Sequence, residues 1–269
     1  MTAGIRKYPR TRHLEGSRLQ PGDEDLEALA FDQLRGRHLV VEEKVDGANA
    51  AVSFDEGGSL LLQSRGHYLR GGAREKHFAL LKTWASGLQG PLRSRLGRRH
   101  VMFGEWVYAK HTVYYDELPH YFLEFDVLDR EHGVFLSTER RRRLLKGLPV
   151  VSVPVLSEGS FDRLEDLVRW VGPSTLKGKR WRERLRAVAG GVPRVDVDRV
   201  ERETDPSDAM EGLYIKVEED GCVVERAKFV RASFLTVVLD AESHWLSRPI
   251  VPNGLREGVD LFADHVGAE

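Results

Sequence analysis

The chain has one cysteine, no long apolar run and almost no net charge, and each scarcity excludes a class of protein. Cys222 stands alone among 269 residues, so a disulfide framework and a cysteine-rich zinc site are excluded within the monomer, as expected in a reducing cytoplasm. No stretch approaches the roughly 18 apolar residues of a membrane span, and residues 1–10 hold no apolar signal segment. The formal net charge of -1 means that any surface for nucleic acid must be local. We therefore expect a cytoplasmic protein that does not attach to membranes.

Hydrophobic residues make up 41% of the chain, enough to bury one large core or two modest ones. Strand-like and helical segments alternate irregularly, which favours antiparallel sheets with helices around them over a repeating barrel. The expected strands are 38–43, 50–54, 60–64, 100–108, 120–128, 211–218 and 222–230. The expected helices are 73–88, 139–146, 162–170, 174–188 and 233–239, and the polar stretch 196–208 has no assignment.

Lys44 follows the first expected strand and is itself followed by Asp46 and Gly47. A primary amine beside a carboxylate, with a glycine that lets a phosphate approach the backbone, is what a lysine needs to act as a covalent nucleophile on a nucleotide. The alternative is a hairpin turn with Asp-Gly at its corner and a solvated lysine beside it. Residues further along the chain favour the first interpretation.

Two acids lie on strand faces that are otherwise apolar. Glu105 shares a face with Val101 and Phe103, and Glu211 shares one with Leu213. Because an ionisable group on an apolar face must be paired or functional, we expect both acids to point into a common site that holds a ribose hydroxyl or a metal. The alternative is that each strand simply ends in solvent.

Cations and one aromatic residue extend this candidate site. Arg226 and Lys228 lie on one mostly apolar face of the last strand, and buried cations need an anion such as nucleotide phosphate or an internal acid. Arg65, just beyond the first hairpin, is a further candidate partner for phosphate or carboxylate. Phe125 offers a ring that can stack on a base, or it belongs to the core.

Taken in order, six segments resemble the motifs of the covalent nucleotidyltransferase superfamily, which comprises polynucleotide ligases and mRNA capping enzymes. Within it, the chain is most similar to ATP-dependent RNA ligases of the RNA ligase 2 type. The segments are Lys44–Asn49, Ser64–Arg65, Phe103–Trp106, Phe122–Asp126, Glu211–Lys216 and Arg226–Lys228. Asn49 favours RNA as the substrate, because DNA ligases and capping enzymes usually carry arginine at that point.

The resemblance implies an α+β fold. The expected architecture is an ATP-grasp-like nucleotidyltransferase domain of two antiparallel β-sheets that form a nucleotide cleft, with flanking helices. It would occupy residues 1–240, and residues 241–269 would form a short C-terminal tail rather than a full accessory domain. Such an enzyme would depend on a partner protein for substrate recognition, or its tail would complete the site.

The resemblance also implies roles for individual residues. Lys44 would be the adenylated nucleophile, with Asp46 and Lys228 also catalytic, and Glu211 and Asp46 would place a divalent metal. The backbone near Glu43 and the ring of Phe125 would hold adenine. The full set of implied nucleotide contacts is Glu43, Asn49, Arg65, Glu105, Phe125, Glu211, Lys216, Arg226 and Lys228. Arg226 stands where the family usually has lysine, and arginine keeps the charge without the compact ammonium geometry.

The implied reaction uses ATP and Mg²⁺, or Mn²⁺, to form lysyl-AMP, transfers AMP to an RNA 5′-phosphate and seals it to a 3′-hydroxyl, as in RNA repair. The first step needs a neutral amine, so we expect Lys228, Arg226 and the metal to lower the pKa of Lys44. One alternative is a capping-type or DNA ligase-like enzyme that modifies ends without sealing RNA. Another is a non-catalytic RNA-binding module.

Three basic clusters are candidate surfaces for RNA phosphates. They are Arg140–Arg143 with Lys146, the cations from Lys177 to Arg186, and those from Arg93 to Arg99. The alternative for each is a solvated helix face whose cations pair with nearby acids. The sequence leaves open whether the RNA is a nicked duplex, a tRNA loop or a mixed RNA–DNA end.

Overall fold

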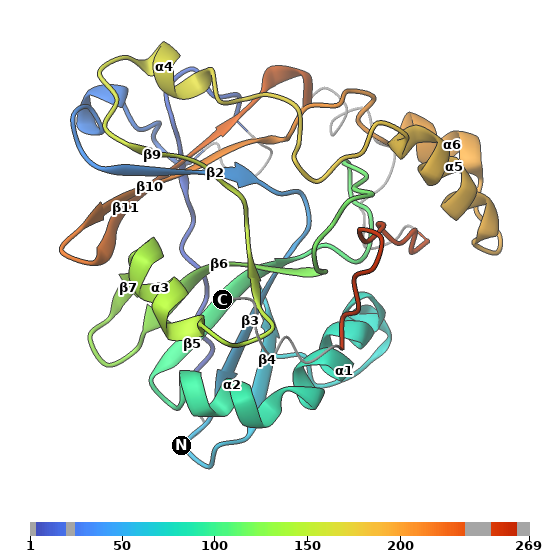
Figure 1. Ribbon diagram of the computed structural model, residues 1–269, viewed down its shortest axis with the longest axis horizontal. Coiled ribbons are helices and arrows are strands. Elements are labelled where there is room, and N and C mark those ends of the chain that lie inside the picture. Colours follow the sequence, from blue (N-terminus) through green and yellow to red (C-terminus); the bar gives the residue numbers. More distant parts are fainter. Residues whose placement is uncertain (1–3, 20–24, 235–248, 263–269) are drawn as a thin grey trace.

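A computed structural model describes residues 4–19, 25–234 and 249–262 (Figure 1). Within these ranges no helix combines the length and the apolar character needed to cross a membrane. The strands are β1 Arg12–His13, β2 Leu39–Lys44, β3 Ala48–Phe54, β4 Leu60–Ser64, β5 His100–Trp106, β6 Phe122–Asp129, β7 Val134–Leu136, β8 Val151–Ser152, β9 Val155–Gly159, β10 Gly212–Glu219 and β11 Cys222–Val230. The helices are α1 Ala79–Gly87, α2 Gln89–Leu96, α3 Thr138–Leu145, α4 Leu164–Val168, α5 Trp181–Gly191 and α6 Val197–Arg202.

The strands form one large sheet with the order β4-β3-β5-β6-β7-β11-β10-β2-β9, in which all neighbours are antiparallel. The prediction of a mixed fold built on antiparallel strands is confirmed. The division into two sheets is not, because β7 pairs with β6 on one side and with β11 on the other. The three residues of β7 are the only link in this path between what we call the lower half-sheet, β4-β3-β5-β6, and the upper half-sheet, β11-β10-β2-β9.

Each half-sheet packs against a hydrophobic core. In the lower half, α1 and α2 pack on the sheet, and Trp84 and Leu92 meet Val52 in one buried cluster. In the upper half, Val41 and Ile215 belong to a second cluster that α4 helps to cover. The chain thus buries two modest cores, and the space between the half-sheets is where a site can form.

Local sequence accounts for the ends of several elements. The β10–β11 hairpin turns at Asp220 and Gly221, which have φ values of 50° and 74°, a combination that suits a tight two-residue turn. Ser137 begins α3, because its side chain accepts a hydrogen bond from the backbone of Arg140. Asp196 caps α6 in the same way through Arg199.

The helix predictions need correction in three places. The segment 73–88 is a 3₁₀ turn, Ala73–Phe78, followed by α1, and α2 was not predicted. α5 starts at Trp181 instead of residue 174, because Ser174 and Thr175 bind the Glu43 carboxylate and hold the chain in a loop. The unassigned stretch 196–208 contains α6. Most of the helix expected at 233–239 lies outside the described residues.

The basic cluster on α3 is not a continuous RNA surface, since Arg141 is fully buried. Its guanidinium binds Glu42 of β2 at 2.5 Å and Glu124 of β6 at 2.7 Å, so it joins the upper and lower half-sheets. Ser152 also donates to Glu124 at 2.7 Å. The helical period that exposes its neighbours turns Arg141 inward.

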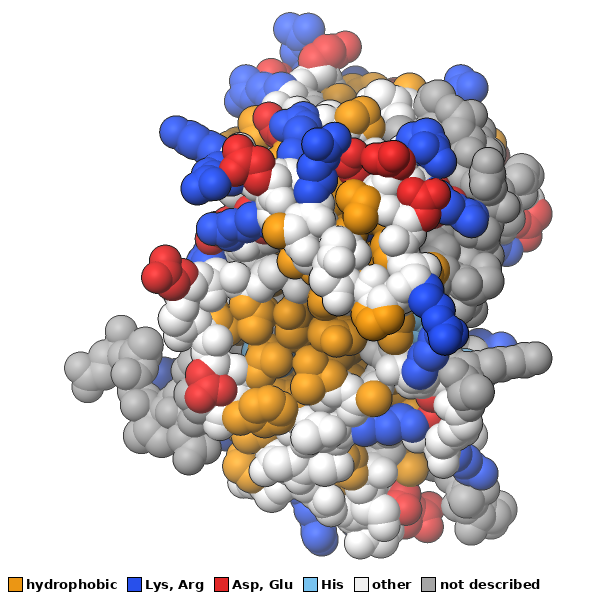
Figure 2. Space-filling model, turned by 90° about the vertical axis from the view of Figure 1, so that its right-hand side faces the viewer, with side chains coloured by type: hydrophobic (Ala, Val, Ile, Leu, Met, Phe, Trp, Pro, Cys, Tyr) orange, Lys and Arg blue, Asp and Glu red, His pale blue; other side chains and the backbone are white. Residues whose placement is uncertain are grey.

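Most of the cations around α5 also have acidic partners. The ion pairs are Arg180–Glu183, Arg182–Asp208, Arg184–Glu117 and Arg186–Glu201. Figure 2 shows the right-hand side of the view in Figure 1, where α5 lies. On this face Lys and Arg side chains are mixed with Asp and Glu near a hydrophobic area. In the cluster at 93–99, Arg99 pairs with Asp129. These pairs reduce the charge that is available to phosphate.

Breaking the Arg141 bridge should destabilise the whole fold. Arg141→Ala leaves Glu42 and Glu124 buried without their shared cation, and we expect a loss of about 3–5 kcal/mol in the free energy of unfolding, measured by urea denaturation. Arg143→Ala on the same helix is the control, because that exposed side chain pairs with exposed Glu139 and should change stability by less than about 1 kcal/mol. Equal effects of the two substitutions would contradict the assignment.

Candidate active site

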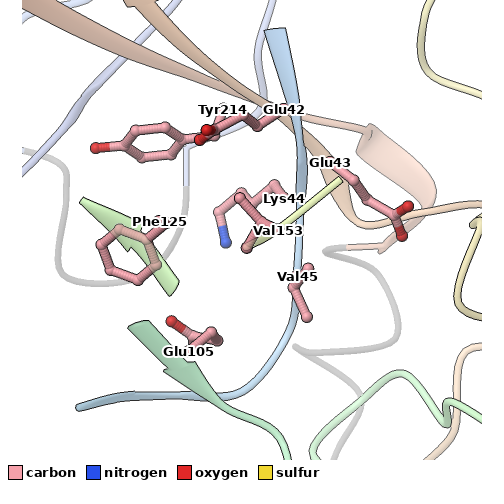
Figure 3. Close-up of a pocket in the computed structure, with 8 residues that line it drawn as sticks. All are labelled: Glu42, Glu43, Lys44, Val45, Glu105, Phe125, Val153 and Tyr214. Carbon is pink, nitrogen blue, oxygen red and sulfur yellow. The ribbon is translucent and has the colours of Figure 1, made fainter. Parts of the chain in front are cut away.

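A pocket lies between the half-sheets, where β2 and β10 face β5 and β6 (Figure 3). Its lining residues are Glu42, Glu43, Lys44, Val45, Glu105, Phe125, Val153 and Tyr214. The amine of Lys44 points into the pocket towards Phe125. The chain therefore brings the lysine, one of the two predicted acids and the predicted ring to one place.

Lys44 is the last residue of β2 and is held by an ion pair. Its Nζ lies 2.6 Å from Glu211 Oε1, and the two side chains are 20% and 2% exposed. Glu211 precedes β10, so it reaches Lys44 from beyond the strand end, while Leu213 and Ile215 face the upper core. The predicted shared face of Glu211 and Leu213 is therefore not how this acid enters the site.

The charge state of Lys44 differs from the expectation. Burial by itself would lower the pKa of Lys44, but Glu211, Glu105 and Asp46 outweigh burial and raise it. Burial raises the pKa of Glu211, against the opposing effect of Lys44 and of Lys228. Burial lowers the pKa of Lys44 as expected, but in the protein alone the net shift is upward, because the neighbouring acids outweigh burial.

Asp46 is oriented by the loop that connects β5 to β6. Its Oδ2 accepts hydrogen bonds from the backbone N–H groups of Thr112 and Val113, both at 2.7 Å. Its own N–H donates to the hydroxyl of Tyr115 at 2.8 Å, and Nδ1 of His111 lies 3.8 Å from its Oδ1. One carboxylate oxygen is thus used by the loop, and the other faces the histidine.

Glu105 and Asn49 are direct neighbours across the β3–β5 pair. Burial raises the pKa of Glu105 to about 8, with repulsion from Glu211 and Asp46 adding to the effect, while Lys44 opposes it. Within the described part of the chain, no donor reaches the buried Oδ1 of Asn49. Arg65 is exposed just after β4 and lies near enough to Glu105 to act on its pKa.

The predicted cations of the upper half-sheet separate into two groups. Lys216 and Arg226 are neighbours across β10–β11, and both are bound by acids of the chain. Lys216 pairs with Glu42 at 2.9 Å and with Asp126 at 3.4 Å, and Arg226 pairs with Asp126 at 3.1 Å. The internal pairing considered for Arg226 therefore occurs, but with Asp126 and not with Glu105 or Glu211. Lys228 belongs to a second group, because its charge acts on Glu211, the partner of Lys44.

Aromatic rings form one end of the pocket. The rings of Phe125 and Tyr214 lie 6.5 Å apart with an interplanar angle of 34°. Tyr8 packs edge-on against Phe125 at 5.0 Å, and its hydroxyl lies 2.9 Å from that of Tyr214 and bonds to Asp126. The N-terminal segment thus supports both rings from behind.

The side chain of Glu43 points away from the pocket (Figure 3). It accepts hydrogen bonds from Ser174 Oγ at 2.5 Å and from Thr175 Oγ1 at 2.9 Å. The side chain of Glu43 is thus engaged by the chain itself, and its backbone N–H donates to Pro154 O at 2.9 Å.

The sequence did not lead us to expect several residues of the site. Glu42 was detectable, because it precedes Lys44 by two positions and shares its strand face. Tyr214 lies in the segment Glu211–Lys216, but nothing in the sequence distinguishes it from an aromatic residue of the core. Tyr8 and Tyr115 carried no signal, since they reach the site from segments without a motif.

The chain matches one protein family model and several solved structures. The family model described as RNA ligase matches residues 37–230, most of the chain. Similar solved structures include one point mutant of Naegleria gruberi RNA ligase with ATP and Mn, at 20% identity and a TM-score of 0.52. Another mutant, with AMP and Mn, has 19% identity and a TM-score of 0.51. Both matches cover 86% of this chain and 57% of the other, and at such identity they show the fold alone.

This chain spans little more than half the length of the solved structures that it resembles. Among curated proteins, none matches the chain.

The raised pKa of Glu105 predicts how stability depends on pH. Between its ordinary pKa of 4.5 and about 8, the folded protein keeps a proton on Glu105 that the unfolded chain releases, so this group makes stability fall as pH rises. Glu105→Gln should flatten that fall in urea denaturation measured across the window. The exposed Glu139→Gln is the control, and equal slopes for wild type and Glu105→Gln would contradict the assignment.

Proposed function

The chain belongs to the RNA ligase family, and from this we propose that it is an ATP-dependent RNA ligase that joins a 3′-hydroxyl to a 5′-phosphate through lysyl-AMP on Lys44. The observation that carries the proposal is a lysine amine in a pocket between two half-sheets, surrounded by acids and next to aromatic rings. The lower and upper half-sheets would be the two walls of an ATP-grasp-like nucleotide cleft. Residues 1–240 would form this domain, which we place in the cytoplasm.

In this proposal the aromatic end of the pocket receives the adenine of ATP once the two rings move apart. A base between two rings needs about 7 Å, twice the carbon contact distance of about 3.5 Å, and Phe125 and Tyr214 stand 6.5 Å apart. A small rotation of either ring would admit adenine, with its edge towards the Glu43 backbone. Glu105 would then bind the ribose, and Arg65 and Lys228 would meet phosphate.

The residues around Lys44 also suit a divalent cation. Glu211 and Asp46 would offer the carboxylate oxygens that Mg²⁺ and Mn²⁺ prefer. When bound, such a cation supplies the positive charge that favours a neutral amine and stabilises phosphate oxygens. The solved relatives described above contain Mn with ATP or AMP.

In the first step, neutral Nζ of Lys44 forms a bond to the α-phosphorus of ATP, and the bond to pyrophosphate breaks. Because Glu211 holds Lys44 as an ammonium, loss of this proton must accompany nucleotide binding. In the second step, an oxygen of the RNA 5′-phosphate takes AMP and the P–N bond breaks. In the third step, the 3′-hydroxyl attacks that phosphate and AMP leaves.

Lys216 and Arg226 contribute differently from Lys228 in this proposal. Their charges are balanced by Glu42 and Asp126, so they stabilise the pocket wall, whereas the charge of Lys228 acts on Glu211 beside Lys44. RNA as substrate rests on the family and on Asn49, and a partner protein for substrate recognition remains part of the proposal.

An end-modifying nucleotidyltransferase that does not seal RNA is the second candidate. Incubation with each NTP in turn, followed by a sealing assay on nicked duplexes with RNA or DNA on each side, separates the two. Label on the protein from one NTP without sealing of any nick would favour end modification. Absence of any label would favour a binding module.

Replacement of the nucleophile is the direct test. Lys44→Ala should abolish transfer of label from α-labelled ATP to the protein and all sealing, because no other amine replaces Nζ in the pocket. Lys146→Ala, an exposed lysine after α3, is the control and should label like wild type. Retained labelling of Lys44→Ala would disprove the assignment.

The proposed stacking of adenine on Phe125 predicts a separate effect on ATP binding. Phe125→Ala removes a stacking partner worth about 1–3 kcal/mol, so the KM for ATP should rise by about 5-fold to 150-fold. Phe161→Leu, in the upper core, is the control and should alter stability but not this KM. An unchanged KM for Phe125→Ala would place the base elsewhere.

A further inference from the structure

A segment near the C-terminus packs on the loop that holds Asp46. Residues 249–255 follow the family-matched region, yet they run beside the loop 107–121 between β5 and β6. Backbone hydrogen bonds join Lys110 N to Val251 O and Gly254 N to Tyr115 O, both at 2.8 Å. The tail is therefore part of the architecture around the pocket.

Asn253 is the centre of this contact and is 2% exposed. Its Oδ1 accepts from Tyr115 N at 2.9 Å, and its Nδ2 donates to Val107 O at 2.8 Å. Its backbone N–H donates to Tyr108 O at 2.8 Å, and its carbonyl accepts from the Tyr121 hydroxyl at 2.8 Å. The side chain of Asn253 and its backbone N–H and C=O groups thus bind residues at the start, in the middle and at the end of the loop.

A short chain of hydrogen bonds leads from Asn253 to Asp46. The amide of Asn253 holds the backbone N–H of Tyr115, whose hydroxyl accepts from Asp46 N at 2.8 Å. Two or three residues earlier in the same loop, Thr112 and Val113 donate to the Asp46 carboxylate at 2.7 Å. Both the backbone and the side chain of Asp46 therefore depend on the position of this loop.

We propose that Asn253 is a positioning residue that orients Asp46 through Tyr115 and the amides of Thr112 and Val113. The inference rests on the proposed function, and it adds a residue that lies outside the family-matched region. Without the Asn253 side chain, Val107 O and Tyr115 N–H lose their buried partners, and the loop is free to shift. A shift of about 1 Å in catalytic geometry can cost about 100-fold in rate.

A double-mutant cycle tests whether the effect passes through Asp46. Asn253→Ala should slow lysyl-AMP formation by about tenfold in the wild-type background and by less than about twofold in the Asp46→Asn background. Equal losses in both backgrounds would mean a general structural effect and would overturn the proposal. Val251→Ala, in the same segment but packed against Trp181, is the matched control and should lower the melting temperature without this rate loss.

Amide hydrogen exchange gives a readout that does not need activity. Asn253→Ala should speed exchange at Asp46, Thr112, Val113 and Tyr115 by at least about tenfold, and Val251→Ala should not. If both variants exchange alike, the proposal fails even where the enzyme is active. If the wild-type protein takes up no label from ATP, or the Asp46→Asn variant takes up too little to measure, the double-mutant cycle cannot be read. Amide hydrogen exchange then decides the proposal.

A variant that retains half of the contact covers the case in which Asn253→Ala does not fold. Asn253→Asp keeps an acceptor for Tyr115 N–H, but it replaces the donor to Val107 O with a second carboxylate oxygen. It should speed exchange at the same four amides, and wild-type exchange at all of them would overturn the proposal.

Discussion

The packing of the upper half-sheet against the lower half-sheet depends on a buried network of ion pairs between them. Glu42 binds both Arg141 and Lys216, Lys216 also binds Asp126, and Asp126 in turn binds Arg226. The half-sheets are otherwise linked in the sheet path only through β7, and their cores are separate. With Glu124 included, three acids face three cations, so the network can remain buried without net charge.

This network divides the basic residues of the site between structure and chemistry. Lys216 and Arg226 satisfy internal acids, while Lys44 meets Glu211 at the open end of the pocket. The acids around Lys44 have the opposite effect from what the first chemical step requires, since they keep the amine protonated. In the proposed mechanism, the nucleotide and its cation must therefore change the balance of charge when they bind.

Residues from outside the family-matched region support both ends of the pocket. Tyr8 lies behind Phe125 and Tyr214 at the aromatic end, and Asn253 lies behind the loop that holds Asp46 at the other. The chain spans little more than half the length of its solved relatives, and it uses short terminal segments to brace its site.

The sequence by itself determined the order of the motifs, the hairpins and the position of Lys44 at the end of a strand, because turn chemistry and alternation are local properties. It did not identify Asp126 as the partner of Arg226, the partners of Arg141 and Lys216, or the loop that displaces the start of α5. Glu211 is 167 positions from Lys44, and Glu42 is 99 positions from Arg141. Only the tertiary structure decided which charges are paired, because pairing and burial depend on which distant strands meet, and alternation specifies only the face on which a side chain lies.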